Sequence, residues 1–317
     1  MRARALALSA LAAIAAASLA QSPPPARPTP QPTRRPPTFE VGIEVINLNV
    51  SVTDPRNRYV TDLKQKDFGV FEDGVRQELT LFSHENLPIS LVLMMDCSAS
   101  MDEKLRVAQD AAVGFVKTLA PHDLAQVVQF NDRRTVLQDF TADQGLLEDA
   151  IRRTEASGPT ALHNALYVSL KELDKQKTGR ELRRRAIVLL SDGEDTASLV
   201  SDDQVMELAR KTEIAIYSIS LRPGRSQDRN RLAFSQAAHL LTTLSQETGG
   251  QVHFPNSISE LDSVYARVAE ELRTQYTLGY VSSNKRRDGK WRRIVVRVPE
   301  RDDLQVRHKI GYYAPRG

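Results

Sequence analysis

The stretch ISLVLMMDCSAS, residues 89–100, decides the fold of this 317-residue chain. Its first seven residues are almost continuously apolar, which is typical of a parallel strand that helices cover on both faces. An amphipathic helix is predicted directly after it, at 103–119, with one face formed by Leu105, Ala108, Ala112, Phe115 and Leu119. A buried strand that runs through a polar loop into a helix indicates an α/β domain.

Strands and helices continue to alternate over residues 88–275. Further strands are predicted at 125–130, 136–140, 186–190, 214–221 and 251–254. Helices are predicted at 144–154, 161–175, 202–211, 234–247 and 258–275. This order predicts an α/β fold with an open, doubly wound and mostly parallel sheet.

The segments on either side of this region, 39–87 and 276–317, contain strands without helices. The first segment alternates apolar and polar residues from Phe39 and has the turn pair Asp73-Gly74 between strands at 68–71 and 78–82. The second contains TLGYV, then Asp288-Gly289 as a predicted hairpin turn, and strands at 291–298 and 305–313.

Each flanking segment is too short to make a stable sandwich alone. We therefore expect 39–87 and 276–317 to be the two halves of one β-sandwich, with the α/β domain of 88–275 inserted between them. Independent folding of the two segments is the alternative.

The N-terminus predicts export. Residues 1–20, MRARALALSALAAIAAASLA, place Arg2 and Arg4 before an Ala/Leu run that ends in small residues, so we expect a signal peptide cleaved after Ala20. A retained anchor is the alternative, but the run is shorter than the roughly 20 apolar residues that span a bilayer. No cysteine follows it to carry a lipid, and no later segment is apolar enough to span. The proline-rich residues 21–38 predict an extended tether, and the destination is the periplasm or the exterior.

The net charge and the cysteine content argue against nucleic-acid binding and against a disulfide-stabilised fold. A formal net charge of +3 is too small to indicate nucleic-acid binding. The sequence has one basic cluster, which we interpret as a solvated hairpin tip, with a contact to an anionic surface as the alternative. Its residues are Lys285, Arg286, Arg287, Lys290, Arg292 and Arg293. Cys97 is the only cysteine, so no intrachain disulfide can form, and its apolar surroundings predict a buried small side chain rather than a reactive thiol.

Polar residues follow two of the predicted strands, where open α/β sheets bind ligands. Asp96, Ser98 and Ser100 follow the first strand, and because they alternate they point the same way. The strand at 186–190 ends at Ser191-Asp192-Gly193, and the loop before the helix at 161–175 presents Thr160. Two carboxylates and three hydroxyls are hard oxygen donors that suit Mg²⁺, with Mn²⁺ or Ca²⁺ as alternatives.

DCSAS resembles the Asp-x-Ser-x-Ser motif of von Willebrand factor A domains, the metal-ion-dependent adhesion site. Thr160 in GPTALHNAL and Asp192 in LLSDGED resemble its two remaining elements. The resemblance implies that Asp96, Ser98, Ser100, Thr160 and Asp192 bind the cation directly or through water. It also implies that a Glu or Asp of a protein ligand completes the shell.

The flanks resemble a group of exported bacterial proteins related to von Willebrand factor A, through DFGVFEDGVRQELTLF, YTLGYV and IGYYAP. The resemblance spans nearly the whole mature chain but brings no known partner or activity.

We expect an exported, non-enzymatic protein that binds a partner protein through the cation. One alternative is a structural envelope protein in which the ion only stabilises loops. A hydrolase is a weaker alternative, because aspartyl phosphatases have a second Asp where Ser98 stands and neither motif serine has an evident histidine partner. We interpret His163 as a helix residue rather than a ligand. Glu194 and Asp195 are interpreted as solvated.

Overall fold

The computed structural model describes residues 45–85, 87–176, 183–191, 195–221 and 236–316, which belong to one compact unit, Ile43–Gly317. The predicted signal peptide, the proline-rich tether and residues 39–44 lie outside the described residues. No helix in the described part of the chain is both long and apolar enough to cross a bilayer.

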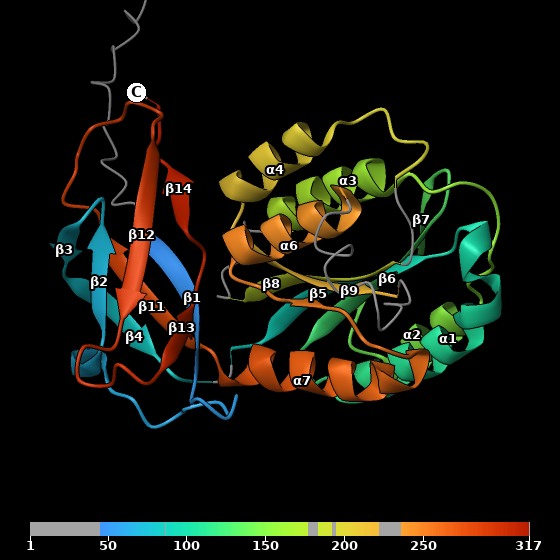
Figure 1. Cartoon of the computed structure of the whole chain (residues 1–317), viewed down its shortest axis with the longest axis horizontal. Coiled ribbons are helices and arrows are strands. Elements are labelled where there is room, and N and C mark those ends of the chain that lie inside the picture. The colour runs from blue at the N-terminus through green and yellow to red at the C-terminus, as the bar shows by residue number, and fades with distance from the viewer. Residues whose placement is uncertain (1–44, 86, 177–182, 192–194, 222–235, 317) are drawn as a thin grey trace, which may run out of the picture. The chain divides into compact units, whose positions relative to one another are not determined.

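A six-stranded sheet forms the centre of the α/β region, in the order β10-β9-β8-β5-β6-β7 (Figure 1). All neighbouring strands are parallel except β6 and β7. The strands are β5 (Ile89–Asp96), β6 (Leu124–Phe130), β7 (Arg134–Thr141), β8 (Arg184–Ser191), β9 (Ile214–Ser220) and β10 (Val252–His253). The predicted doubly wound, mostly parallel sheet is therefore confirmed.

Helices cover both faces of this sheet (Figure 1). One side has α1 (Asp102–Val116), α2 (Gln144–Arg152) and α7 (Leu261–Thr274), and the other has α3 (Leu162–Lys175), α4 (Asp202–Lys211) and α6 (Gln236–Thr248). Side chains of β5 alternate between the two cores, with Leu91 and Leu93 on the first side and Val92 and Met94 on the second. This double burial explains why β5 is a continuous apolar run.

The remaining strands form two four-stranded sheets, β13-β1-β11-β4 and β14-β12-β2-β3. Before the α/β region come β1 (Val45–Thr53), β2 (Gly69–Glu72), β3 (Val75–Gln77) and β4 (Leu79–Ser83). After it come β11 (Tyr276–Val281), β12 (Trp291–Arg297), β13 (Gln305–Arg307) and β14 (Gly311–Tyr313). Each sheet combines strands from both flanks, and one apolar core joins the two sheets, with Val50 and Tyr276 from the first and Val70 and Ile294 from the second. The two flanking segments thus form one β-sandwich, which agrees with the predicted fold class. The predicted domain boundaries at residues 88 and 275 stay a prediction.

Two of the predicted turns have different outcomes. Asp73 and Gly74 have φ angles of 48° and 85° and join β2 to the short strand β3, which the sequence did not predict. The hairpin predicted at Asp288-Gly289 is wrong, because β11 pairs with β1 and β4 while β12 pairs with β2 and β14. Apolar residues of β11 and β12 fill the core from opposite sheets, which a hairpin would prevent.

The interpretation of the basic cluster as one solvated tip is also wrong for Arg292. This side chain lies in β12, is 5% exposed, and donates to the Asp288 carboxylate at 2.8 Å. The aspartate of the predicted turn therefore pairs with an inward-facing arginine.

Candidate functional site

The site predicted from the sequence lies where the order of the strands reverses. The chain passes from β5 to β6 on one side, and later returns to β8 on the other side of β5. Asp96 is the last residue of β5 and is fully buried. In sheets of this type, the carboxyl ends of the strands at such a reversal form the usual ligand-binding edge.

The Asp96 carboxylate is oriented by two hydrogen bonds. The Ser191 hydroxyl at the end of β8 donates to Asp96 Oδ2 at 2.5 Å, and the Ser98 amide donates to Asp96 Oδ1 at 2.9 Å. Sequence reasoning did not assign Ser191 a role. The parallel register of β5 and β8, in which Met95 is opposite Leu190, brings the next residues of the two strands together, and the sequence alone does not show this pairing.

Ser98 and Ser100 present two hydroxyl oxygens that lie 3.1 Å apart. Ser98 is 2% exposed, whereas Ser100 is exposed, in the short helix η2 (Ala99–Met101) that leads into α1. Adjacent oxygens of an octahedral Mg²⁺ shell lie about 3 Å apart, given metal–oxygen distances of 2.0–2.1 Å. The pair therefore has the spacing that a small hard cation needs.

The loop that carries Thr160 is tied to the loop after β5. The Ala99 amide donates to the Gly158 carbonyl at 3.0 Å, and the Ser157 amide donates to the Cys97 carbonyl at 2.8 Å. Gly158 has a φ of 71°, so glycine suits this turn. The backbone thus brings the predicted residue Thr160, which is 4% exposed, close to the serine motif.

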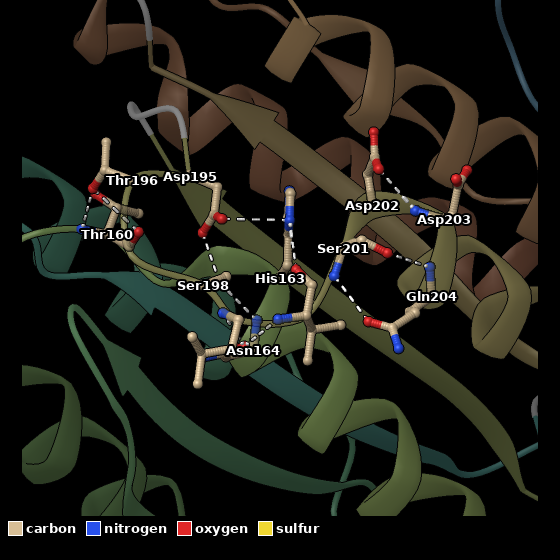
Figure 2. A network of polar contacts seen from close by, with 12 residues as sticks. Thr160, His163, Asn164, Asp195, Thr196, Ser198, Ser201, Asp202, Asp203 and Gln204 are labelled. Carbon is tan, nitrogen blue, oxygen red and sulfur yellow. Dashed lines mark hydrogen bonds and ion pairs between the residues drawn. The ribbon is translucent and has the colours of Figure 1, made fainter.

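A second loop also holds Thr160, as Figure 2 shows. The Thr160 amide donates to the Thr196 hydroxyl at 3.0 Å, and the Thr196 amide donates to the Thr160 carbonyl at 2.8 Å. Sequence reasoning missed Thr196, and only its place four residues after Asp192 could have suggested it. Asp192 and Glu194 lie outside the described residues.

Asp195 is not the solvated residue that the sequence suggested. Its Oδ1 accepts from the Ser198 hydroxyl at 2.7 Å, and its Oδ2 lies 3.4 Å from His163 Nδ1 (Figure 2). His163 lies in the first turn of α3, as expected of a helix residue, and its Nδ1 is also 3.2 Å from the Val200 carbonyl. This network attaches the loop after β8 to the start of α3.

The far end of that loop is fixed by a helix cap. The Ser201 hydroxyl accepts from the Gln204 amide at 3.3 Å, and the Gln204 side chain accepts from the Ser201 amide at 3.0 Å, which starts α4 (Figure 2). The residues from Asp195 to Ser201 are thus anchored at both ends.

Cys97 lies between the metal-motif residues without joining them. It is fully buried, which confirms the prediction, and burial together with the Asp96 carboxylate raises the pKa of its thiol to about 12. Among the described residues, no group of three or more His, Cys, Asp or Glu could hold a metal ion. The predicted donors that the structure describes, Asp96, Ser98, Ser100 and Thr160, all offer oxygen atoms, which are hard ligands.

Comparison with known protein families gives a match over part of the chain. Residues 91–194 match the von Willebrand factor type A domain, which confirms the resemblance drawn from the sequence. The matched range runs from β5 to the loop after β8 and so includes the whole predicted cation site.

Two curated relatives are described only in general terms. An uncharacterised protein of Synechocystis is 35% identical over 112 residues, which are 34% of this chain and 26% of that protein. A UPF0353 protein of Nocardia farcinica is 26% identical over 223 residues, which are 61% of this chain and 66% of that protein. The chain therefore matches less than two thirds of the length of either relative.

Among solved structures, this chain is similar to a von Willebrand factor type A protein from Catenulispora acidiphila. The identity is 12%, the TM-score is 0.49, and the alignment covers 87% of this chain and 74% of the other. It is also similar to proximal thread matrix protein 1 from the mussel byssus, with a zinc-occupied adhesion motif, at 17% identity and a TM-score of 0.47, covering 62% and 48% of the two chains.

Proposed function

We propose that this protein binds a partner protein through one divalent cation held by Asp96, Ser98, Ser100, Thr160 and Asp192. Von Willebrand factor type A domains are in general protein-interaction modules, so the match over 91–194 supports this class of role. The observation that carries the proposal is the Ser98 and Ser100 hydroxyl pair, 3.1 Å apart beside the oriented Asp96 carboxylate.

The charge of the donor set is compatible with an acidic partner. Two carboxylates balance the two positive charges of a divalent cation without an excess of negative charge, because hydroxyl groups carry no formal charge. A hard anionic oxygen can therefore enter a remaining coordination position of the ion. The exposed Ser100 gives such a group access from solvent. A Glu or Asp side chain of the partner is therefore the proposed ligand.

We propose Mg²⁺ as the cation, with Mn²⁺ or Ca²⁺ as alternatives. The serine spacing suits the short bonds of Mg²⁺, whereas Ca²⁺ takes longer bonds of 2.3–2.6 Å and more ligands. The ion supplies a positively charged position for the partner's carboxylate, and this chain's hydroxyls and carboxylates hold it.

The alternative, in which the ion only stabilises loops, has less support from the contacts. The loop after β5 is already joined to Gly158 by a backbone hydrogen bond, and Thr160 is already joined to Thr196. Because these loops are held by the protein itself, a cation is not needed to bring them together.

We also propose that the protein acts after export and is not an enzyme. The terminal segment MRARALALSALAAIAAASLA supports export. Ser98 stands where aspartyl phosphatases have a second Asp, which argues against that class of hydrolase.

Calorimetric titration of the chain from residue 21 with Mg²⁺ and Mn²⁺ tests the site. We expect saturable binding that is lost in Asp96→Ala and Thr160→Ala variants and retained in Thr80→Ala, which changes an exposed threonine of the sandwich. Binding that survives in both site variants would place the cation elsewhere.

A pull-down from envelope extracts then tests the function. A partner should be retained in Mg²⁺, released by EDTA, and absent with Asp96→Ala. If the wild type binds metal but retains no protein in a metal-dependent way, the structural envelope role becomes the better account.

A further inference from the structure

A small cavity lies at the opposite edge of the parallel sheet from the cation site. Its volume is about 50 Å³. The α/β region contributes the first residues of β8 and the end of α6, and the sandwich contributes one face of β1 and β11. The lining residues that matter here are Asn47, Asn49, Arg184, Arg185, Thr277 and Lys309.

Arg184 is a buried cation whose charge is not balanced locally. It is 2% exposed, and its NH1 and NH2 groups donate to the carbonyls of Leu272 at 2.9 Å, Gln275 at 2.6 Å and Glu85 at 3.3 Å. No carboxylate of the described residues lies within ion-pair distance of Arg184, and Asp123 acts on it only at longer range. A buried charge without a counter-ion is costly, so a negative group beside it is favoured.

Two polar atoms of the lining residues have no partner in the described part of the chain. These are Arg184 Nε and Thr277 Oγ1, both fully shielded from solvent and both able to donate a hydrogen bond. Buried donors are nearly always hydrogen-bonded in folded proteins. Both residues line this cavity, so an acceptor placed there would complete their hydrogen bonding.

The sandwich face of the cavity adds further donors. Asn49 lies opposite Thr277 in the antiparallel register, and Asn47 lies opposite Gly279, so both asparagines share a face with the threonine.

The charge around the cavity is positive. Arg183, Arg184, Arg185 and Lys309 line it, against the single carboxylate of Glu213. That carboxylate is 3.3 Å from Arg185, which also pairs with Asp174 at 3.0 Å. Both carboxylates therefore pair with Arg185, and neither is within ion-pair distance of Arg184.

We propose that this cavity binds one small inorganic oxyanion of the phosphate or sulfate type. A water needs roughly 10–15 Å³ of such space, so the cavity holds about four waters or one tetrahedral oxyanion, and a nucleotide or peptide is too large. Oxyanion oxygens accept from the guanidinium Nε, the threonine hydroxyl and the asparagine amides together. The anion joins β1 and β11 to the start of β8, so its binding stabilises the junction of the sandwich and the α/β region.

Thermal unfolding in EDTA, with phosphate, sulfate or chloride at matched ionic strength, tests the proposal independently of the cation site. At 100 times its Kd, the better oxyanion should raise the Tm by about 5 °C or more, saturably. Thr277→Val should remove this shift. In anion-depleted buffer the same variant should be as stable as the wild type or more so, because it deletes an unpaired buried hydroxyl.

Asn49→Val should weaken the anion effect as well, and Thr80→Val, at an exposed threonine of neighbouring β4, should leave it unchanged. A larger shift with phosphate than with sulfate, or the reverse, identifies the oxyanion. Equal shifts with chloride and the oxyanions, an oxyanion shift that Thr277→Val retains, or no saturable shift at all would overturn the proposal.

Discussion

The two edges of the parallel sheet are formed by the opposite ends of the same strands, but they carry groups of opposite charge. Strand β8 begins with Arg184, which is 2% exposed, and ends with Ser191, which donates to the carboxylate of Asp96. At the carboxyl edge, carboxylate and hydroxyl oxygens gather near the exposed Ser100. At the amino edge, arginines gather around a small cavity that the sandwich lines.

The difference lies in access as well as in charge. A site that recognises a partner has to reach solvent, and the serine motif does so through Ser100. A site that only balances a buried charge needs no such exposure, and Arg184 is 2% exposed. Charge alone therefore does not identify a recognition site, and the position of the sandwich decides which edge can contact another protein.

The largest effect is expected from removing the charge of Asp96. Asp96→Asn keeps the side-chain volume but replaces an oxygen acceptor by an amide group, so Mg²⁺ affinity should fall by about 100-fold or more. Titration calorimetry measures it, with Asp203→Asn on exposed α4 as the control. A loss below 5-fold would mean that the carboxyl edge does not hold the cation through Asp96.

The corresponding change at the amino edge is Arg184→Met. It leaves the carbonyls of Leu272, Gln275 and Glu85 without their donor, so the free energy of unfolding should fall by about 3 kcal/mol. Urea unfolding measures this, with the exposed Arg106→Met as the control. Mg²⁺ affinity should stay within 2-fold of the wild type, and a larger change would show that the two edges are coupled.

A pH titration compares Arg184 with a second buried base, His253. Burial, helped by Arg267, lowers the pKa of His253 to about 4, whereas burial lowers that of Arg184 only to about 10. At neutral pH the arginine is therefore charged and the histidine neutral. Because the unfolded histidine titrates near 6.5, its contribution to stability is complete above pH 6.5 and is lost as the pH falls towards 4.

The loss from His253 amounts to about 3 kcal/mol at most. Urea unfolding in EDTA measures the free energy of unfolding of the wild type and of His253→Gln at pH 7 and pH 4.5. The contribution of His253 is the amount by which the wild type loses more stability between these pH values than the variant does. The variant should lose less stability on acidification. Identical pH dependences would show that His253 is not held neutral.

The smallest effect is expected at Thr196. Thr196→Val removes the hydroxyl that accepts from the Thr160 amide but keeps the shape of the side chain, so Mg²⁺ affinity should fall about 3- to 10-fold. Thr243→Val on α6 is the control, because this half-buried threonine donates to a carbonyl of its own helix and lies outside the site. Affinity unchanged by Thr196→Val would mean that the Thr160 loop needs no support from the loop after β8.

The fold was predictable to the extent that burial on two faces leaves a pattern in the sequence. Strand β5 is apolar throughout because both cores contact it, and its end at Asp96 marks the site. The hairpin at Asp288-Gly289 was predicted wrongly because turn residues show that the chain bends without showing which sheet the next strand joins. That choice depends on the sandwich core, which brings together residues more than 200 positions apart.

Within the site, Asp96, Ser98, Ser100 and Thr160 were predictable because each follows a pattern near a strand end. Ser191 and Thr196 were not, since their roles depend on which strand lies beside β5 and on where the loop after β8 folds back. The role of Arg184 was hidden for the same reason, because a charged residue at a strand start is usually solvated and only the sandwich makes it buried.

The central claim is that the serine motif at the carboxyl edge holds a divalent cation. A crystal structure of the chain from residue 21 grown with Mn²⁺, with the ion located by its anomalous scattering, tests it most directly. The account predicts one strong peak within about 2.3 Å of the Ser98 and Ser100 hydroxyl oxygens, absent in Asp96→Ala crystals. No peak at the motif in well-ordered wild-type crystals, or a peak only elsewhere on the chain, would contradict it.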